Sequence, residues 1–435
     1  MLVKNNFYKT IFQRNFNNDL PRGIISPSRS TEEGNTNDGH VILNDLAIGL
    51  SSCEQRSNYP RLRLSEIKID RDPIIDLEKP TSNLFIKMNI HSLDGEYFGS
   101  EDIIKDVYLT EHSLNQLCSI LFRAGVKVNS TLIKSLPSDM AVEVLNKCLK
   151  AYSNFCKNMH SDNYNVNYNS YARYMLSHDD FITKVEPNRV RNDYFDFYVT
   201  RHIDTGRYIL NSINSLKYTR IKNVDIVERI HNMTKGNANL VVSKIHHSDF
   251  CLAIKVIDIN NPIQLDPNNP DDIGYVGVEI INSEIGTRKL TIRRVIFRKV
   301  CSNGMWGFDT THTYHKKHIG SEIKNYVLVL QDYFHDLLHS DGSDAKKLSH
   351  RFAIAHDRLI ATSQEEREKF LKYLGLRDKE IESAITNHAT EEKKDMRTAF
   401  DVIQAITAAA RVTHSVERRS ELEYIAGEYF GRITA

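Results

Sequence analysis

The most basic stretch of the sequence is residues 286–320, which contain eight Lys or Arg residues and a single acidic residue, Asp309. Trp306, the only tryptophan of the chain, lies within it. Cations that track phosphates and a ring that stacks on bases are what a groove for single-stranded nucleic acid requires. The sequence therefore predicts a nucleic-acid-binding surface made by Trp306 and these cations: Arg288, Lys289, Arg293, Arg294, Arg298, Lys299, Lys316 and Lys317.

The basic run leaves a second interpretation open, because its alternation is not clean. Arg294 and Arg298 fall on the same parity as the apolar Ile292, whereas a two-sided strand would separate charged from apolar residues. Either a β-bulge redirects part of the strand, or some arginines pair with acids elsewhere, such as Glu279 or Glu284. In the second case the strand is an ion-paired sheet face and not a binding surface.

Cys301, Asn303 and Gly304 form a predicted structural turn directly after the basic run. Asn and Gly tolerate the positive φ angles of tight hairpin turns. Cys301 could in principle act as a nucleophile beside His312 or His315, but a thiol at a strand end next to a tight turn is more typical of a structural residue. We assign no catalytic residue to this segment.

Three neighbouring histidines, His312, His315 and His318, raise the alternative of a metal-dependent enzyme. On a strand, however, His312 and His315 point to opposite faces, and on a helix His318 drifts off the shared side. We therefore predict no bound metal and no cofactor. Partly exposed histidines are expected instead, and when protonated they would add to the basic surface. The sequence also lacks the motifs of P-loop, dinucleotide-binding, zincin and nucleophile-elbow enzymes.

The pattern along the chain predicts an α+β protein, with an antiparallel β-sheet core flanked by helices and a helical C-terminal region. The polar run Ser26–His40 has too little apolar surface to offset the entropy of ordering it. Leu114, Leu117, Cys118 and Leu121 recur at helical spacing and predict a helix. The expected divisions are a flexible polar extension, a mixed α/β region, the antiparallel core with the basic strand, and the helical region, at residues 1–60, 61–235, 236–320 and 321–435.

Composition indicates a cytoplasmic protein that does not enter a membrane. The 57 Lys and Arg residues balance 56 Asp and Glu residues, so the charge of the whole chain predicts neither a nucleic-acid nor a membrane partner. No run of 18 apolar residues exists, and the N-terminal residues lack the apolar core of a signal peptide. The six cysteines are scattered without a CxxC pair, which indicates reduced thiols.

The stretch VGVEIINSEIGTRKLTIRRVIFRKVCSNGMW resembles the signature of a phage- and plasmid-encoded family known as domain of unknown function number nine-three-two. The shared features are a strand ending in an Asn-Ser pair, a basic strand and a Cys-x-Asn-Gly turn. The resemblance continues in HKKHIG and in AFDVIQAITAAARV, and it covers roughly residues 105–430. It implies a mobile-element origin, and it carries no established catalytic residues.

These observations lead to a first hypothesis of sequence-nonspecific binding to single-stranded DNA. By analogy with the annealing proteins of phage recombination, the role would be strand annealing or recombination, and a homo-oligomer would give multivalent binding. If the whole basic surface engages, the salt dependence should reflect about six to eight neutralised phosphates. A second hypothesis is a protein-interaction factor that inhibits a host component such as a defence system. The metal-dependent enzyme is the third.

Overall fold

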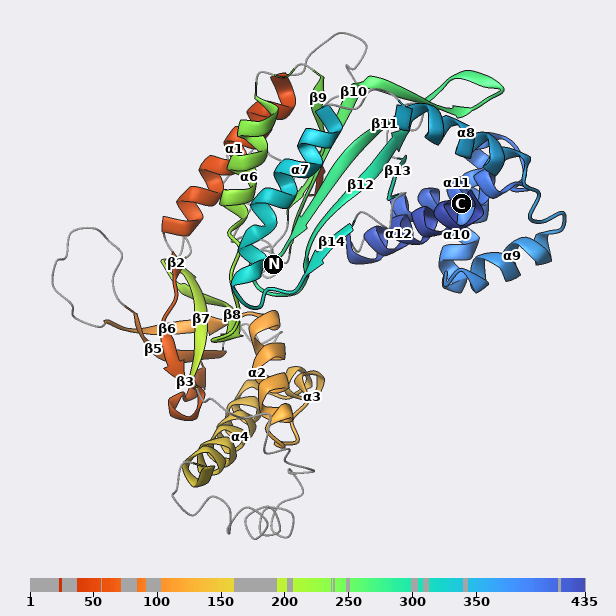
Figure 1. Ribbon diagram of the computed structural model, residues 1–435. Coiled ribbons are helices and arrows are strands. Elements are labelled where there is room, and N and C mark those ends of the chain that lie inside the picture. The colour runs from red at the N-terminus through yellow and green to blue at the C-terminus, as the bar shows by residue number, and fades with distance from the viewer. Residues whose placement is uncertain are drawn as a thin grey trace. The chain divides into compact units, whose positions relative to one another are not determined.

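The computed structural model divides into two compact units, each built on its own β-sheet (Figure 1). The first unit contains residues 46–220, and the second contains residues 221–435 together with part of the segment 21–45. The structure describes residues 23–25, 37–55, 57–71, 84–90, 103–159, 194–201, 206–235, 237, 239–247, 251–298, 304–307, 313–338, 343–413 and 416–434.

The first unit is a sheet of seven described strands covered by helices. The strand order is β2-β7-β8-β6-β5-β4, with β3 also paired to β7, and every pairing is antiparallel except that of β6 with β8. Its elements are β2 (Ser57–Asn58), β3 (Arg61–Arg63), η1 (Leu64–Glu66), β4 (Ile69–Arg71), β5 (Leu84–Ile90), β6 (Ile103–Leu109), α2 (Glu111–Arg123), α3 (Ser130–Ser135), α4 (Ser138–Met159), β7 (Tyr194–Arg201) and β8 (Tyr208–Ser215).

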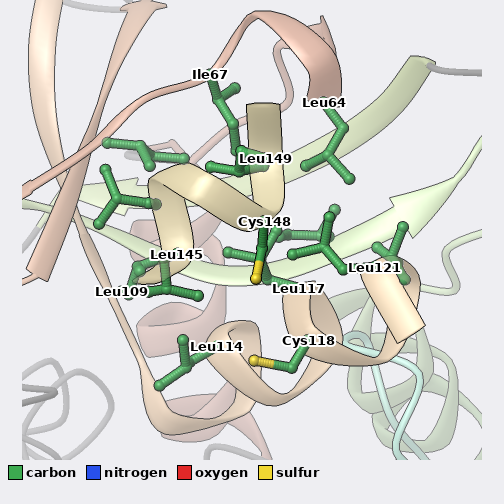
Figure 2. Close-up of a cluster of buried hydrophobic side chains, with 14 of the residues drawn as sticks. Leu64, Ile67, Leu109, Leu114, Leu117, Cys118, Leu121, Leu145, Cys148 and Leu149 are labelled. Atoms are coloured by element: carbon green, nitrogen blue, oxygen red, sulfur yellow. The ribbon is translucent and has the colours of Figure 1, made fainter. Parts of the chain in front are cut away.

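Helices α2 and α4 supply the apolar layer of this unit. Thr110 caps α2: its side chain accepts from the Ser113 backbone N–H, and the Thr110 backbone N–H donates to the Ser113 hydroxyl in return. The apolar stripe predicted from the sequence is buried, and Figure 2 shows Leu117 and Leu121 of α2 beside Cys148 of α4. All five described cysteines are buried and none forms a disulfide.

The second unit is a sheet of seven described strands in the order β1-β9-β10-β11-β12-β13, with β14 paired to β12. Long strands β10, β11 and β12 run antiparallel at its centre (Figure 1). Its elements are β1 (Gly23–Ile25), α6 (Asn223–Thr234), β9 (Leu240–His247), β10 (Leu252–Asp266), β11 (Asn269–Asn282), β12 (Leu290–Arg298), β13 (Gly304–Gly307), β14 (Thr313–Lys316), η3 (Ser321–Asn325), α7 (Tyr326–Leu338), α8 (Ser343–Asp357), α9 (Gln364–Tyr373), α10 (Asp378–Glu392), α11 (Ala399–Val412) and α12 (Val416–Ile433).

Helix α11 is the centre of the C-terminal helices, and every residue from 399 to 410 is buried. Its N-terminal N–H groups are capped by Thr398 and Asp401. At its other end the guanidinium of Arg419, on α12, donates to the carbonyls of Ala410 and Thr413 at 3.0 and 2.8 Å. Side chains thereby bond backbone groups at both ends of α11.

The fold class agrees with the prediction, since the described residues form an α+β protein with predominantly antiparallel sheets and a helical C-terminal region. The predicted divisions differ from the observed units. The C-terminal helices share one apolar core with Ile263 and Ile296 of the sheet, so residues 236–320 and 321–435 belong to one unit. The boundary between the units falls at residue 220, so α6 joins the second unit.

The expected extension over residues 1–60 is wrong in part, because α1 (Asn37–Gln55) is a 19-residue helix. Its buried residues Leu43, Leu46, Leu50 and Cys53 recur at helical spacing. The polar run that precedes them concealed this stripe. Gly23–Ile25 also pairs with β9 as the edge strand of the second sheet.

Candidate nucleic-acid interface

Three of the eight cations of residues 286–320 are the arginines of β12, and each of the three binds an acid on another element. Arg293 is 4% exposed, and its Nε lies 2.5 Å from Oε2 of Glu279 on the neighbouring strand β11. Lys255 of β10 and Glu423 of α12 complete a buried group of four charges. The Lys255 Nζ lies 3.2 Å from Glu279 and 2.8 Å from Glu423.

Two cations and two anions make this buried group electrically neutral. Burial alone would raise the pKa of Glu279, but the charges of Arg293 and Lys255 and the hydrogen bonds from both lower that pKa to about 2. Glu279 is therefore ionised at neutral pH. Because Glu423 belongs to α12, the four charges also join the C-terminal helix to the sheet.

Arg298 lies in a second buried group at the other end of β12. It is 4% exposed and forms a two-pronged pair with Asp272, with a further bond of 2.6 Å from NH1 to Glu392 at the end of α10. The same nitrogen donates to Oε1 of Gln404 at 2.9 Å, and the guanidinium lies over the ring of Phe400. Arg298 therefore holds α10 and α11 against the sheet.

Arg294 pairs with Asp336 of α7 at 3.2 Å. Its side chain is 21% exposed, and that of Asp336 is 59% exposed. A pair this accessible is screened by water and contributes little to stability.

Arg293 and Arg298 are thus corrections to the predicted binding surface. Their guanidiniums are buried and bonded to carboxylates, so neither can reach a phosphate in this structure. The alternative of an ion-paired sheet face is confirmed for Arg293, whose partner Glu279 was one of the two acids considered. The other, Glu284, accepts from the backbone N–H of Asn223 at the start of α6.

Among the predicted residues whose burial the structure describes, four are exposed, and we call them the basic rim: Lys289, His315, Lys316 and Lys317. Strand pairing brings them together, because Leu290 of β12 lies opposite Lys316 of β14. Neither residues 285–292 nor residues 313–320 contain an acidic residue. Arg288 precedes the rim and is half-buried. Both Arg288 and Lys289 lie just before β12.

His315 lies opposite Thr291, and its Nδ1 is 2.9 Å from the Thr291 hydroxyl. Partial burial, followed by the charges of Arg293 and Lys289, lowers the pKa of His315. The expectation of an exposed histidine is right for His315 and wrong for His318, which is 4% exposed. Within the part of the chain that the structure describes, no three His, Cys, Asp or Glu side chains could hold a metal ion; His312 lies outside that part.

Trp306 lies in β13, opposite Ile296 of β12. Strands β12 and β13 pair antiparallel, but Gly304 begins β13 opposite Arg298 and so lies on the strand and not within the turn where the sequence placed it. Three further predicted residues, Lys299, Cys301 and Asn303, lie outside the described residues, and their roles stay predictions.

The partners of the arginines are what sequence reasoning missed. Asp272, Glu392 and Glu423 lie 26, 94 and more than 100 positions from the arginines that they bind. No spacing rule connects such residues. The parity of Arg298, shared with the apolar Ile292, was a usable signal for that residue alone. Arg294 has the same parity and is partly exposed, and Arg293 has the other parity and is buried.

Comparisons with known proteins give no match: no family model, no curated protein and no solved structure is significantly similar to this chain. The resemblance to the phage- and plasmid-encoded family stays a prediction. No helix among the described residues combines the length and the apolar character that crossing a membrane requires.

Proposed function

We propose that this protein binds single-stranded DNA without sequence preference through the basic rim, in the cytoplasm of a host cell. The observation that carries the proposal is the pairing of β12 with β14. It brings the exposed residues Lys289, Lys316 and Lys317 to the same end of the sheet, and neither residues 285–292 nor residues 313–320 contain an acid. Ammonium groups on flexible stems bind phosphates as point charges, and contacts to phosphates carry no sequence information. Sequence-independent binding follows from that chemistry.

The rim is smaller than the surface expected from the sequence, and this changes the expected salt dependence. Three lysines can neutralise about three phosphates, so the slope of log affinity against log salt should be about −2 for a single strand. The eight cations of the sequence would have given a much steeper dependence. The slope therefore measures how many of these cations are available.

The test is fluorescence anisotropy with a labelled single strand of about 30 bases at two salt concentrations. The triple variant K289E/K316E/K317E should bind at least about tenfold more weakly than the wild type. A matched control is K369E/K372E/K379E, which makes the same charge change at exposed lysines of α9 and α10. The proposal fails if the rim variant binds as well as the wild type, or if the wild type does not bind at low salt.

Strand annealing or recombination is the role in which we propose that such binding is used. The support is the family resemblance and the order of basic strand followed by helices, which is an analogy at the level of setting and fold. Two complementary labelled strands, mixed with and without the protein, test it directly. Faster duplex formation with the wild type than with the rim variant is the expected outcome.

A further inference from the structure

His315 is the member of the basic rim whose charge can change near neutral pH. Its Nδ1 is engaged with the Thr291 hydroxyl, which leaves Nε2 as the ring nitrogen available to another partner. The residue is exposed, and the next two residues along the chain are Lys316 and Lys317. The charge of Lys289 acts on His315 across the pairing of β12 with β14, so a phosphate held by Lys289 lies within reach of the imidazole, whereas Lys316 alternates to the opposite face of the strand.

Cations surround His315 on two elements. On its own segment they are Lys316 and Lys317, and from the β12 side they are Lys289 and Arg293, the latter paired with Glu279. Together with partial burial, the charges of Arg293 and Lys289 keep the pKa of His315 below its ordinary value. Without an anion, the imidazole is neutral at neutral pH.

We propose that His315 takes up a proton from solvent when the basic rim binds a nucleic-acid phosphate, so that binding tightens as the solution becomes mildly acidic. This inference rests on the proposed function. The phosphate offsets the repulsion from Lys289 and Arg293, and the imidazolium Nε2–H then donates to a phosphate oxygen. No other bond forms or breaks.

The size of the effect follows from linkage between binding and protonation. Each unit by which the bound phosphate raises the pKa of His315 makes affinity about tenfold higher at the acidic limit than at the basic limit. Affinity rises as pH falls through the pKa of the bound state. It levels off below the lower pKa of the unbound state.

The experiment measures binding of full-length protein to an oligothymidine strand of about 30 bases at pH values of about 5.5 and 8. Thymine was chosen because it does not titrate in this range. H315Q keeps a polar group near Thr291 but cannot take up a proton, and H315K is charged throughout. H350Q, at an exposed histidine of α8, is the control.

Wild type and H350Q should bind about three- to tenfold more tightly at the lower pH. H315Q should lose most of that difference, and H315K should bind tightly at both pH values. A wild-type pH dependence that H315Q and H315K both retain overturns the inference, as does equal wild-type binding at the two pH values. In either case the proposed function stands, whereas absence of wild-type binding at both pH values overturns both.

Discussion

Arg298 and Asp272 form a two-pronged ion pair inside the second unit, with Nε 2.6 Å from Oδ1 and NH2 2.7 Å from Oδ2. Asp272 is fully buried, and Arg298 nearly so. The carboxylate raises the pKa of Arg298 further above its ordinary value through hydrogen bonds and charge that outweigh burial. The charge of Arg298 on β12 is therefore neutralised inside the unit, where it joins the sheet to the C-terminal helices.

Replacing Arg298 by Met should destabilise the protein by about 3–5 kcal/mol, because Asp272 is left buried and unpaired. The double variant R298M/D272N should lose less than the sum of the two single losses, since no buried charge is stranded between them. Urea unfolding of the four proteins measures both quantities. Additive losses would show that the pair is not coupled.

Arg294 supplies the matched control on the same strand. Its pair with Asp336 is open to water, so R294M should change stability by about 0–1 kcal/mol. A loss as large as that of R298M would mean that the strand tolerates no arginine replacement, whatever the partner. Comparing R294M with R298M thus shows whether the loss of stability depends on burial of the ion pair or only on the position of the arginine on β12.

Gly277 is required by the close approach of β10 and β11. A Cβ at this position would lie 2.3 Å from the carbonyl oxygen of Val256, which is backbone and cannot move aside. G277A should therefore cost about 1–3 kcal/mol or more through overpacking. G431A, near the end of α12 with no atom within 4 Å of the added carbon, should be neutral or slightly stabilising. Thermal unfolding of both variants decides this, and equal midpoints would contradict the contact.

The sequence predicted local features well and distant partners poorly. The cap at Thr110 and the stripe of α2 depend on residues three or four positions apart, so periodicity reveals them. Arg293 and Glu279 lie on adjacent strands, which made their pairing a reasonable alternative from the sequence. Glu423 comes from a helix far along the chain, and only the packing of α12 on the sheet brings it to Lys255.

The basic rim shows that the sequence also could not predict which basic residues are exposed. The sequence placed Lys289, Lys316 and Lys317 in one basic segment together with the buried arginines, because composition does not report burial. Burial separates the two groups in the structure. The three lysines beside the β12–β14 pairing are exposed, whereas neighbouring elements cover Arg293 and Arg298. Burial depends on which elements pack against a strand, and that is decided by tertiary contacts.

The lowered pKa of Glu279 predicts that the free energy of unfolding decreases in acid. Its pKa lies at about 2 in the folded protein, below the ordinary value of 4.5, so the folded state holds fewer protons than the unfolded chain between these values. Its contribution to stability is complete above pH 4.5 and is lost as pH falls toward 2. In E279Q the slope of unfolding free energy against pH should be smaller in this window. An unchanged slope would assign acid unfolding to other carboxylates.

Arg419 closes the C-terminal end of α11, where its guanidinium donates to three backbone carbonyls, those of Ala410, Arg411 and Thr413. Burial lowers the pKa of Arg419 while nearby Glu423 opposes that shift, so the cation is held by carbonyls in a partly buried site. R419M should cost about 2–3 kcal/mol, because carbonyls at the end of a buried helix lose charge-assisted hydrogen bonds.

R419K should lie between the wild type and R419M, since an ammonium lacks the planar fork that reaches several carbonyls at once. Arg432 on the same helix is the control: its pair with Glu428 is exposed, and R432M should change stability by less than about 1 kcal/mol. Hydrogen exchange of the α11 amides adds a local measurement. Faster exchange in R419M than in R432M is expected if the cap holds the helix end, and equal exchange would show that water can replace it.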